Sequence, residues 1–490
     1  MPSTAIIDEL DCETLFPAPS LPPSALSPQR LPGTSVQSLA ALQYVLKDNH
    51  KRWHIFLNDL KQHNHVAHRA LALYALGGSG SLIREFYEQD GGEQLPPIEP
   101  PEAITSTNFL DHLGDERYYK AYVTFFGQEI DEKRIPVVLG QYIFSDRFQY
   151  REGASNQPEM LSRFMLSLFH ALIHVSYGVE FGLKGMVVEG LALTAVQNLP
   201  GNEFYPEHFF TDGAQGTTEV VTHLVSSLTV GGSVPKITGS EADVHVFDII
   251  ARIVRDDILR VDNGPVPRIV FKQAVVEHAP RIRAYAAQWT IDVTRKGEIE
   301  RKMEELIWLS SAVYAVGGFD EVNGFTADFY LMHVVTSSLS LPSLITSLRP
   351  RSQALLLRAY LVAVLTWWVA RGCPVLNVKP FMISTSTRLA VPVSEGNDSS
   401  VCPDEHPNPF LSIIQTSILH PDNHLVKIQR SFAHFSTVYG NRPAGYHKGT
   451  ELEDAELLDG SLFVRAALLT ANYMGSKEEP KFWSRRGFFS

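Results

Sequence analysis

Histidines inside apolar segments are the residues of this chain whose spacing could support chemistry. His170 and His174, in SLFHALIHVSYGVEF, are four residues apart, so in a helix they share one face, one turn apart. His65 and His68 are three apart and are also helical neighbours. Two imidazoles placed in this way can bind one metal ion. In a continuous helix His63 would point about 140° away from His68, so we expect it to lie outside any shared site.

A further histidine, His333, lies in the apolar run FYLMHVVTSSLSL, with the hydroxyls of Thr336 and Ser337 one turn later. A single buried histidine is more often a hydrogen-bonded core residue than a metal ligand. A set of them is different, because each ring needs partners for two nitrogens and convergence on a metal satisfies several rings at once. Helical bundles build metal sites from such inward-pointing side chains. The predicted metal ligands are His65, His68, His170, His174 and His333. Of these, the predicted catalytic residues are His170, His174 and His333.

Imidazole ligands alone do not select the metal and leave its charge uncompensated. Glu180, six residues after His174, could place a carboxylate behind the ligands, or it could be a solvated helix residue. Lys379 lies between Val378 and Pro380 in an apolar run. If burial kept its amine neutral, Lys379 could take up carbon dioxide and ligate the metal as a carbamate. Its stem could instead pack while its ammonium reaches water.

Other candidates have weaker support. His223, in the apolar run VVTHLVSSLTV, could replace one member of the histidine set. One later helix carries a basic row that could line a substrate pocket or could be solvated: His424, Lys427, Arg430 and His434. Four aromatic residues could form a wall for a flat substrate or could be ordinary core: Tyr177, Trp367, Trp368 and Phe381.

Helical periodicity must position these residues, because strand-like alternation is scarce. A Pro/Ser-rich N-terminal arm, residues 1–34, precedes a region, 35–490, without a long linker. We expect an all-α fold, a large single-domain multi-helix bundle or irregular helical array with its site in the core. The predicted helices lie within 38–60, 65–78, 115–126, 158–177, 179–196, 217–228, 241–261, 298–316, 326–339, 352–370, 423–438 and 453–473.

Composition excludes several classes of protein. A net charge of −12 offers no basic surface for nucleic acid or anionic membranes. Cys12, Cys373 and Cys402 are far apart and predict neither a disulfide framework nor a zinc ribbon. The first residues do not resemble a secretory signal, so we expect a cytoplasmic protein. The most apolar stretch, 354–370, is interrupted by Arg358 and is predicted to be a buried core helix, not a membrane span.

Nucleotide and hydrolase motifs are also missing. No G-x-G-x-x-G follows a strand, so a Rossmann flavin or nicotinamide site is not expected. Neither a P-loop nor a G-x-S-x-G elbow occurs.

Three segments resemble the questin oxidase-like family of fungal secondary metabolism: HNHVAHRALALYALGG, FHALIHVSYGVEFGLKGMVVEGLALTA and FYLMHVVTSSLSL. The resemblance runs from about Leu39 to the C-terminal helices. It implies oxidative ring cleavage of anthraquinone-type aromatic polyketides, formally like a Baeyer–Villiger insertion, without a flavin domain. Where the family block often has proline after the first paired histidine and glycine after the second, this chain has Ala171 and Val175-Ser176. These differences affect the spacers and leave both histidines in place.

The resulting hypothesis is a non-haem iron dioxygenase. Ferrous iron, held by three or four of the five predicted histidines, would act with O2 as co-substrate on an electron-rich phenol or reduced quinone. NADPH would enter only through a separate quinone reductase. One alternative is a metal-free or NADPH-using Baeyer–Villiger-type oxidase in which histidines act as bases. The other is a helical scaffold or binding protein whose histidines belong to core hydrogen-bond networks.

Overall fold

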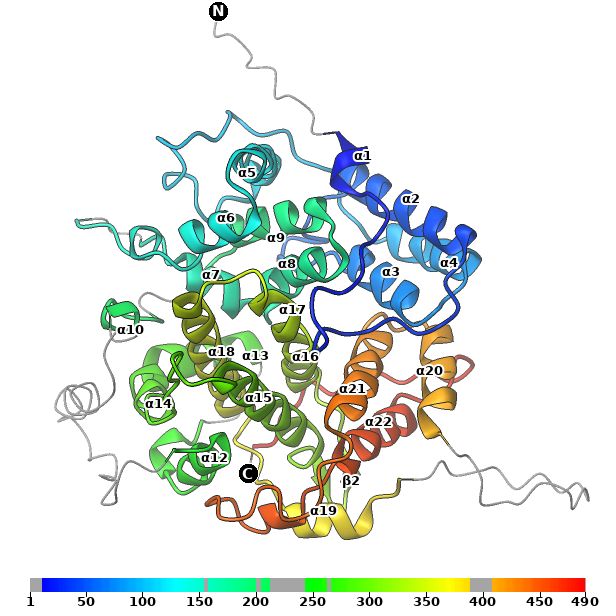
Figure 1. Cartoon of the computed structure of the whole chain (residues 1–490), viewed down its shortest axis with the longest axis vertical. Helices are drawn as coiled ribbons and strands as arrows, with labels where there is room; N and C mark the ends of the chain where they lie inside the picture. Colours follow the sequence, from blue (N-terminus) through cyan, green and yellow to red (C-terminus); the bar gives the residue numbers. More distant parts are fainter. Residues whose placement is uncertain are drawn as a thin grey trace, which may run out of the picture.

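Apolar residues that recur every three to four positions build helices along most of the chain. The computed structural model describes residues 11–153, 157–199, 204–211, 243–261, 266–387 and 408–489. Within these ranges the only sheet is a hairpin of two short antiparallel strands, β1 (Phe319–Asp320) and β2 (Gly324–Phe325). The prediction of an all-α helical array is therefore confirmed (Figure 1).

The helices of the first half are α1 (Cys12–Leu15), α2 (Val36–Arg52), α3 (Val66–Ala75), α4 (Gly80–Gly91), α5 (Tyr119–Lys133), α6 (Ile135–Tyr142), α7 (Met160–Leu166), α8 (His170–Phe181), α9 (Lys184–Val196) and α10 (His208–Thr211). Those of the second half are α12 (Val246–Val254), α13 (Pro267–Gln273), α14 (Ala279–Ala286), α15 (Glu298–Ala315), α16 (Phe329–Ser338), α17 (Leu341–Ile345), α18 (Pro350–Ala370), α19 (Val378–Ser384), α20 (Pro409–Leu419), α21 (Leu425–Tyr439) and α22 (Ser461–Met474). Short 3₁₀ turns lie at Glu116–Tyr118, Asp146–Phe148, Asp257–Leu259 and Ala455–Leu457, and a π-helical turn lies at Ala274–His278.

Several helix boundaries differ from the prediction, and two of these differences lie next to the histidine-containing segments. Helix α2 ends at Arg52, although apolar periodicity continues to residue 60, because the following segment folds back on itself as a loop. The helix predicted over 158–177 is broken into α7 and α8, which meet at 89°. Leu168 and Phe169 adopt left-handed backbone at this break, where no glycine or proline signals it. Because of this break, His170 is the first residue of α8. The predicted helix at 217–228 lies outside the described residues.

Four helices form a closed ring around the site. Helix α3 contacts α8 and α21, and α16 contacts the same two helices. In Figure 1, α3 (blue) and α21 (orange) lie side by side although they are distant in the sequence. The ring therefore brings together side chains from four separate parts of the chain.

The described part of the predicted N-terminal arm lies against this ring. The backbone N–H of Ser20 donates to the carbonyl of Phe181, at the end of α8. The N–H of Leu31 donates to the carbonyl of Ala75, at the end of α3. The arm thus ties two of the four helices together.

Helix α18 is the one described helix long and apolar enough by itself to cross a membrane. Within its most apolar window, however, 89% of the residues are buried inside the structure. Arg358, which interrupts its apolar sequence, places its guanidinium over the ring of Phe209. The prediction of a buried core helix is confirmed.

A buried ion pair fixes the start of α16. Asp328 caps this helix by accepting hydrogen bonds from the N–H groups of Tyr330 and Leu331. Its other carboxylate oxygen pairs with Arg371, at the end of α18, and both side chains are 1% exposed. Arg371 also donates to the carbonyl of Arg485, near the C-terminus. One carboxylate therefore joins α16, α18 and the C-terminal segment.

Replacing Asp328 by alanine should lower the free energy of unfolding by about 3–5 kcal/mol, because it leaves a buried guanidinium without its counter-ion. Urea unfolding monitored by circular dichroism measures the change. The matched control is Glu321→Ala, an exposed carboxylate between β1 and β2, which should shift the same quantity by less than about 0.5 kcal/mol. A loss below about 1 kcal/mol for Asp328→Ala would contradict this account.

Candidate metal centre

The loop before α3 and the first turn of that helix position the first three histidines. His63 lies in an isolated antiparallel bridge with Phe56. The next residue, Asn64, is buried, and its Oδ1 accepts from the first N–H of α3. His65 is the N-cap residue of α3, and His68 lies one turn into that helix. Because residues 63–65 are not helical, His63 and His65 both reach the site.

Helix α8 and its partner α9 supply the next histidines and a carboxylate. His170 begins α8 and His174 lies one turn later. Gly182 turns the chain in left-handed backbone, and α9 then packs back along α8. Glu189 on α9 meets His174, with 2.9 Å between His174 Nε2 and Glu189 Oε2. Its other oxygen lies 2.7 Å from His50 Nδ1.

Helices α16 and α21 complete the site. His333 Nδ1 donates to the carbonyl of Phe329 over 2.8 Å, which leaves Nε2 free to act as a ligand. At the start of α21, Asp422 Oδ1 accepts from the backbone N–H groups of His424 and Leu425. The same oxygen lies 3.7 Å from His424 Nδ1. The His424 ring is thereby held at the helix terminus.

These residues form a continuous cluster of seven histidines. Within it, three overlapping triads each offer one ligand atom per residue within 4.8 Å of the others: His63, His68 and His174; His63, His65 and His170; and His65, His333 and His424. His65 Nε2 lies 3.0 Å from His170 Nε2, and His68 Nε2 lies 3.1 Å from His174 Nδ1. All five predicted ligands come together. The expectation that His63 lies apart is wrong, because it assumed a helix that begins before residue 63.

Burial keeps six of these rings neutral. Desolvation lowers the pKa of His170 to about 3 and that of His424 to about 4. The same cause lowers the pKa well below the ordinary histidine value for His63, His65, His68 and His333. A neutral imidazole presents a nitrogen lone pair, the form that binds a metal.

The carboxylate behind the ligands is Glu189, which the sequence reasoning missed. Burial alone would raise its pKa, but hydrogen bonds from His174 and His50 lower it to about 2, so it is ionised. Glu180, the predicted candidate, is buried and forms an ion pair with Arg430. It is therefore not solvated, and its carboxylate pairs with Arg430 and not with a histidine ring.

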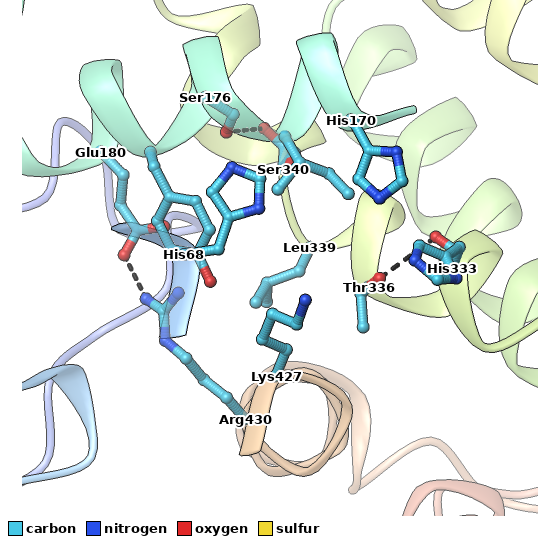
Figure 2. Close-up of a pocket in the computed structure, with 12 residues that line it drawn as sticks. His68, His170, Ser176, Glu180, His333, Thr336, Leu339, Ser340, Lys427 and Arg430 are labelled. Atoms are coloured by element: carbon cyan, nitrogen blue, oxygen red, sulfur yellow. Dashed lines mark hydrogen bonds and ion pairs between the residues drawn. The ribbon is translucent and has the colours of Figure 1, made fainter. Parts of the chain in front are cut away.

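The lysine of the site is Lys427, not Lys379. Lys379 is exposed on α19 and lines a surface cleft with residues such as Glu321 and Glu453, so the premise that burial activates it is wrong. Lys427 on α21 is buried, and burial lowers the pKa of its amine to about 7. Figure 2 shows this amine pointing from α21 toward the histidines.

A pocket opens directly onto the cluster (Figure 2). His68, His170, His333 and Lys427 line one part of it, and Tyr177, Glu180 and Arg430 line another. The basic row from His424 to His434 is buried, so the alternative that these residues are solvated is wrong. His424 belongs to the histidine cluster, and Lys427 and Arg430 line the pocket. The pocket leaves room for about one water molecule, so a ring-sized ligand requires lining side chains to move.

Other candidates fall elsewhere. Among the proposed aromatic wall residues only Tyr177 lines this pocket; Trp367 stacks on Phe271, and Trp368 and Phe381 are core residues. His223 lies outside the described residues.

Histidine ring nitrogens without a hydrogen-bond partner show that a metal fits this site. In the described part of the chain, several buried ring nitrogens have no hydrogen-bond partner: both nitrogens of His63, Nδ1 of His68, and Nε2 of His333 and His424. Buried polar atoms without partners are rare and point to a missing ligand. Nitrogen donors of this type suit iron, zinc, copper or nickel. The fold and site thus define a helical protein with a histidine-rich candidate metal centre.

Sequence comparisons place this architecture in a family. The model of the questin oxidase-like family matches residues 62–432, and the chain belongs to that family. It is 30% identical to questin oxidase of Aspergillus fumigatus over 70% of this chain and 72% of the relative. It is 25% identical to questin oxidase of Aspergillus terreus over 81% and 80% of the two chains. It is 28% identical to the Baeyer-Villiger monooxygenase AacuH of Aspergillus aculeatus over 63% and 62%. The resemblance seen in the three histidine-containing segments is confirmed.

Proposed function

We propose that this protein is an oxidase that uses O2 to cleave a ring of an anthraquinone-type polyketide at a histidine-ligated iron. The observation that carries the proposal is the convergence of buried histidines with unpartnered nitrogens on a pocket, in a chain whose relatives are named questin oxidase and Baeyer-Villiger monooxygenase.

Four histidines would hold the iron: His65, His170, His333 and His424, termed here the four-histidine group. His65 lies at its centre, with ring centroids 5.0 Å from His170, 4.7 Å from His424 and 6.4 Å from His333. Two members, His170 and His333, line the pocket. Bound iron would supply a Lewis acid and a redox centre for the reaction of O2 with an electron-rich ring.

An anion at this group would offset the charge of the iron. Helices α3, α8 and α21 begin at the site, and each directs the positive end of its dipole toward it, which adds to the demand for negative charge. Lys427 can meet that demand as a carbamate. Its amine nitrogen would form a bond to the carbon of CO2 and release one proton, which converts a neutral donor into a carboxylate-like ligand.

The far part of the pocket would bind the oxygen substituents of the substrate. Arg430 pairs with Glu180 through Nη2 and also interacts with the hydroxyl of Tyr177, while its Nε and Nη1 have no well-aligned acceptor among the described residues. Its guanidinium also lies 5.7 Å from the centre of the Tyr177 ring. A phenolate or quinone oxygen could accept from the free N–H groups, which would place the ring between Arg430 and the four-histidine group. A reduced substrate would come from a separate NADPH-dependent reductase.

A second candidate function is metal-free oxygenation. The Glu189–His174 contact resembles an oriented general base, and neutral histidines can deprotonate a phenol for direct reaction with O2. The names of the Baeyer-Villiger relatives are compatible with that chemistry. Metal dependence separates the two functions.

The deciding experiment combines metal analysis with oxygen uptake on a reduced anthraquinone. We expect iron in protein purified without chelator, loss of uptake after chelation, and recovery of uptake on addition of Fe²⁺. Zn²⁺ is the control and should not restore activity, because it has no redox chemistry. Undiminished oxygen uptake by metal-free protein would refute the iron-dependent function and support the base-catalysed one.

A further inference from the structure

We propose that His63, His68 and His174, termed the three-histidine group, form a second metal site beside the iron. This inference rests on the proposed function, which identifies the first site as an iron site. The second site would bind a tetrahedral divalent ion of the Zn²⁺ type. The two groups share no residue, although the ligand atoms of His63, His65 and His170, drawn from both groups, also lie within 4.8 Å of one another.

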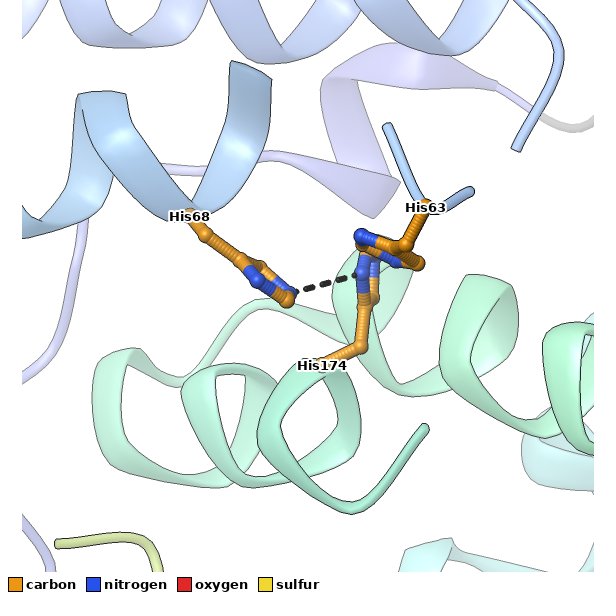
Figure 3. A group of neighbouring side chains, drawn as sticks. All are labelled: His63, His68 and His174. Carbon is orange, nitrogen blue, oxygen red and sulfur yellow. Dashed lines mark hydrogen bonds between the residues drawn. The ribbon is translucent and has the colours of Figure 1, made fainter. Parts of the chain in front are cut away.

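The geometry of the group suits one ion. A ligand atom from each ring lies within 4.8 Å of the others. Figure 3 shows His68 and His174 converging from neighbouring helices, with His63 entering from the loop before α3. The ring of His63 stacks at 4.7 Å on His68 and at 4.9 Å on His170, so it lies between the two groups. Three ligands from the chain leave a fourth position of a tetrahedral ion for water.

Hydrogen bonding already sets the tautomer that a ligand needs. Because Glu189 accepts from His174 Nε2, the Nδ1 atom of His174 carries a lone pair, and this atom faces His68 Nε2 at 3.1 Å. A carboxylate that orients a metal-binding histidine in this way is a usual part of zinc sites. The negative charge of Glu189 would also offset the charge of the ion. Each group thus has its own carboxylate, since Asp422 lies beside His424 of the four-histidine group.

A network of hydrogen bonds alone does not account for His63. Its side chain is 3% exposed, and neither ring nitrogen has a partner among the described residues. A neutral imidazole always carries one N–H and one lone pair, so both are left unsatisfied. Coordination would use the lone pair. His68 Nδ1 is likewise without a partner on the described chain.

Two of the three ligands of the second site lie outside the lining of the substrate pocket. Of the three-histidine group, only His68 lines that pocket. On the other side, Glu189 leads to His50, which lines a separate surface cleft with Trp53 and Tyr119. A metal ion could enter from this cleft. The second ion would therefore hold α3 and α8 together and act on the first site through shared packing.

Metal stoichiometry of the full-length protein tests the proposal. Protein purified without chelator and loaded with Fe²⁺ and Zn²⁺ should bind two equivalents. We expect His63→Ala to bind one equivalent and to keep its iron, and His424→Ala to bind one equivalent and to lose its iron. Glu189→Gln keeps the shape of the site and covers the case in which His63→Ala does not fold. When combined with His424→Ala, the Glu189→Gln substitution should weaken the binding of Co²⁺ to the three-histidine group by about 10- to 100-fold. The visible absorption of bound Co²⁺ measures this binding.

Three other metal contents would contradict one or both sites. In the first, the wild type binds only one equivalent of metal, lost in His424→Ala but kept in His63→Ala. That result would contradict the second site and support the iron site. One equivalent that only His63→Ala removes would overturn both the two-site proposal and the four-histidine group. No metal in the loaded wild type would overturn both sites.

Discussion

His424→Ala should remove iron from the protein and lower kcat/KM on a reduced anthraquinone by roughly 10³-fold or more, equivalent to about 4 kcal/mol of transition-state stabilisation. His424 Nε2 has no partner on the described chain, and its ring lies 4.7 Å from that of His65 and 5.1 Å from that of His333. Loss of this imidazole would open one position of the four-histidine group. Iron content and steady-state oxygen uptake measure the two effects.

The matched control is His434→Ala, on the same helix. His434 is also buried, but its Nε2 bonds to the carbonyl of Leu26 in the N-terminal arm, away from the cluster. This variant should keep its iron and should change kcat/KM by less than about threefold. If His424→Ala retained both iron and turnover, the four-histidine group would be wrong.

The sequence predicted the members of the site that depend on helical periodicity. His170 and His174 share a helix face, and His65, His68 and His333 lie in apolar segments that proved to be buried. Spacing within one helix places His170 beside His174, and the apolar segments around His68 and His333 predict their burial. The prediction of an all-α array succeeded for the same reason. His65 reaches the site although it precedes the first turn of α3 as its N-cap residue.

The missed residues depend on contacts between segments that are distant in sequence or on breaks in helices. His63 reaches the cluster because α3 begins only at Val66 and the preceding segment pairs with Phe56. Glu189 lies opposite His174 because α9 folds back along α8, a contact that the fifteen-residue separation could have suggested for a helical hairpin. Because a buried metal-binding histidine usually has a carboxylate partner, a glutamate on the helix after α8 could have been expected to contact His174.

The choice between the two lysines shows a limit of reading local sequence. Lys379 has apolar neighbours in the sequence, but it lies exposed on the short helix α19. Lys427 is flanked by Val426 and Ile428 and looked like part of a basic row. It is buried because α21 packs against α3 and α16, and no local pattern specifies that docking.

Lys427→Met should lower turnover by about 10²- to 10³-fold and weaken iron retention, because methionine keeps the length and burial of the side chain but cannot form a carbamate. Lys379→Met is the control and should leave both quantities unchanged, since this side chain is exposed on α19. Intact mass measurement under mild conditions, together with ¹³C NMR after exchange with labelled bicarbonate, should detect a carbamate in the wild type that Lys427→Met lacks.

A smaller side chain separates the carbamate from a purely structural role of Lys427. In Lys427→Ala the vacated space can admit a short carboxylate, so millimolar acetate or propionate should restore part of the activity and the iron content. Chloride at the same ionic strength should restore neither, because it lacks the carboxylate oxygens that would replace the carbamate. If the amine itself acted as a base, methylamine and not acetate would restore activity. Full turnover by a wild-type enzyme whose Lys427 carries no added mass would rule out the carbamate and leave Lys427 as a neutral or cationic neighbour of the iron.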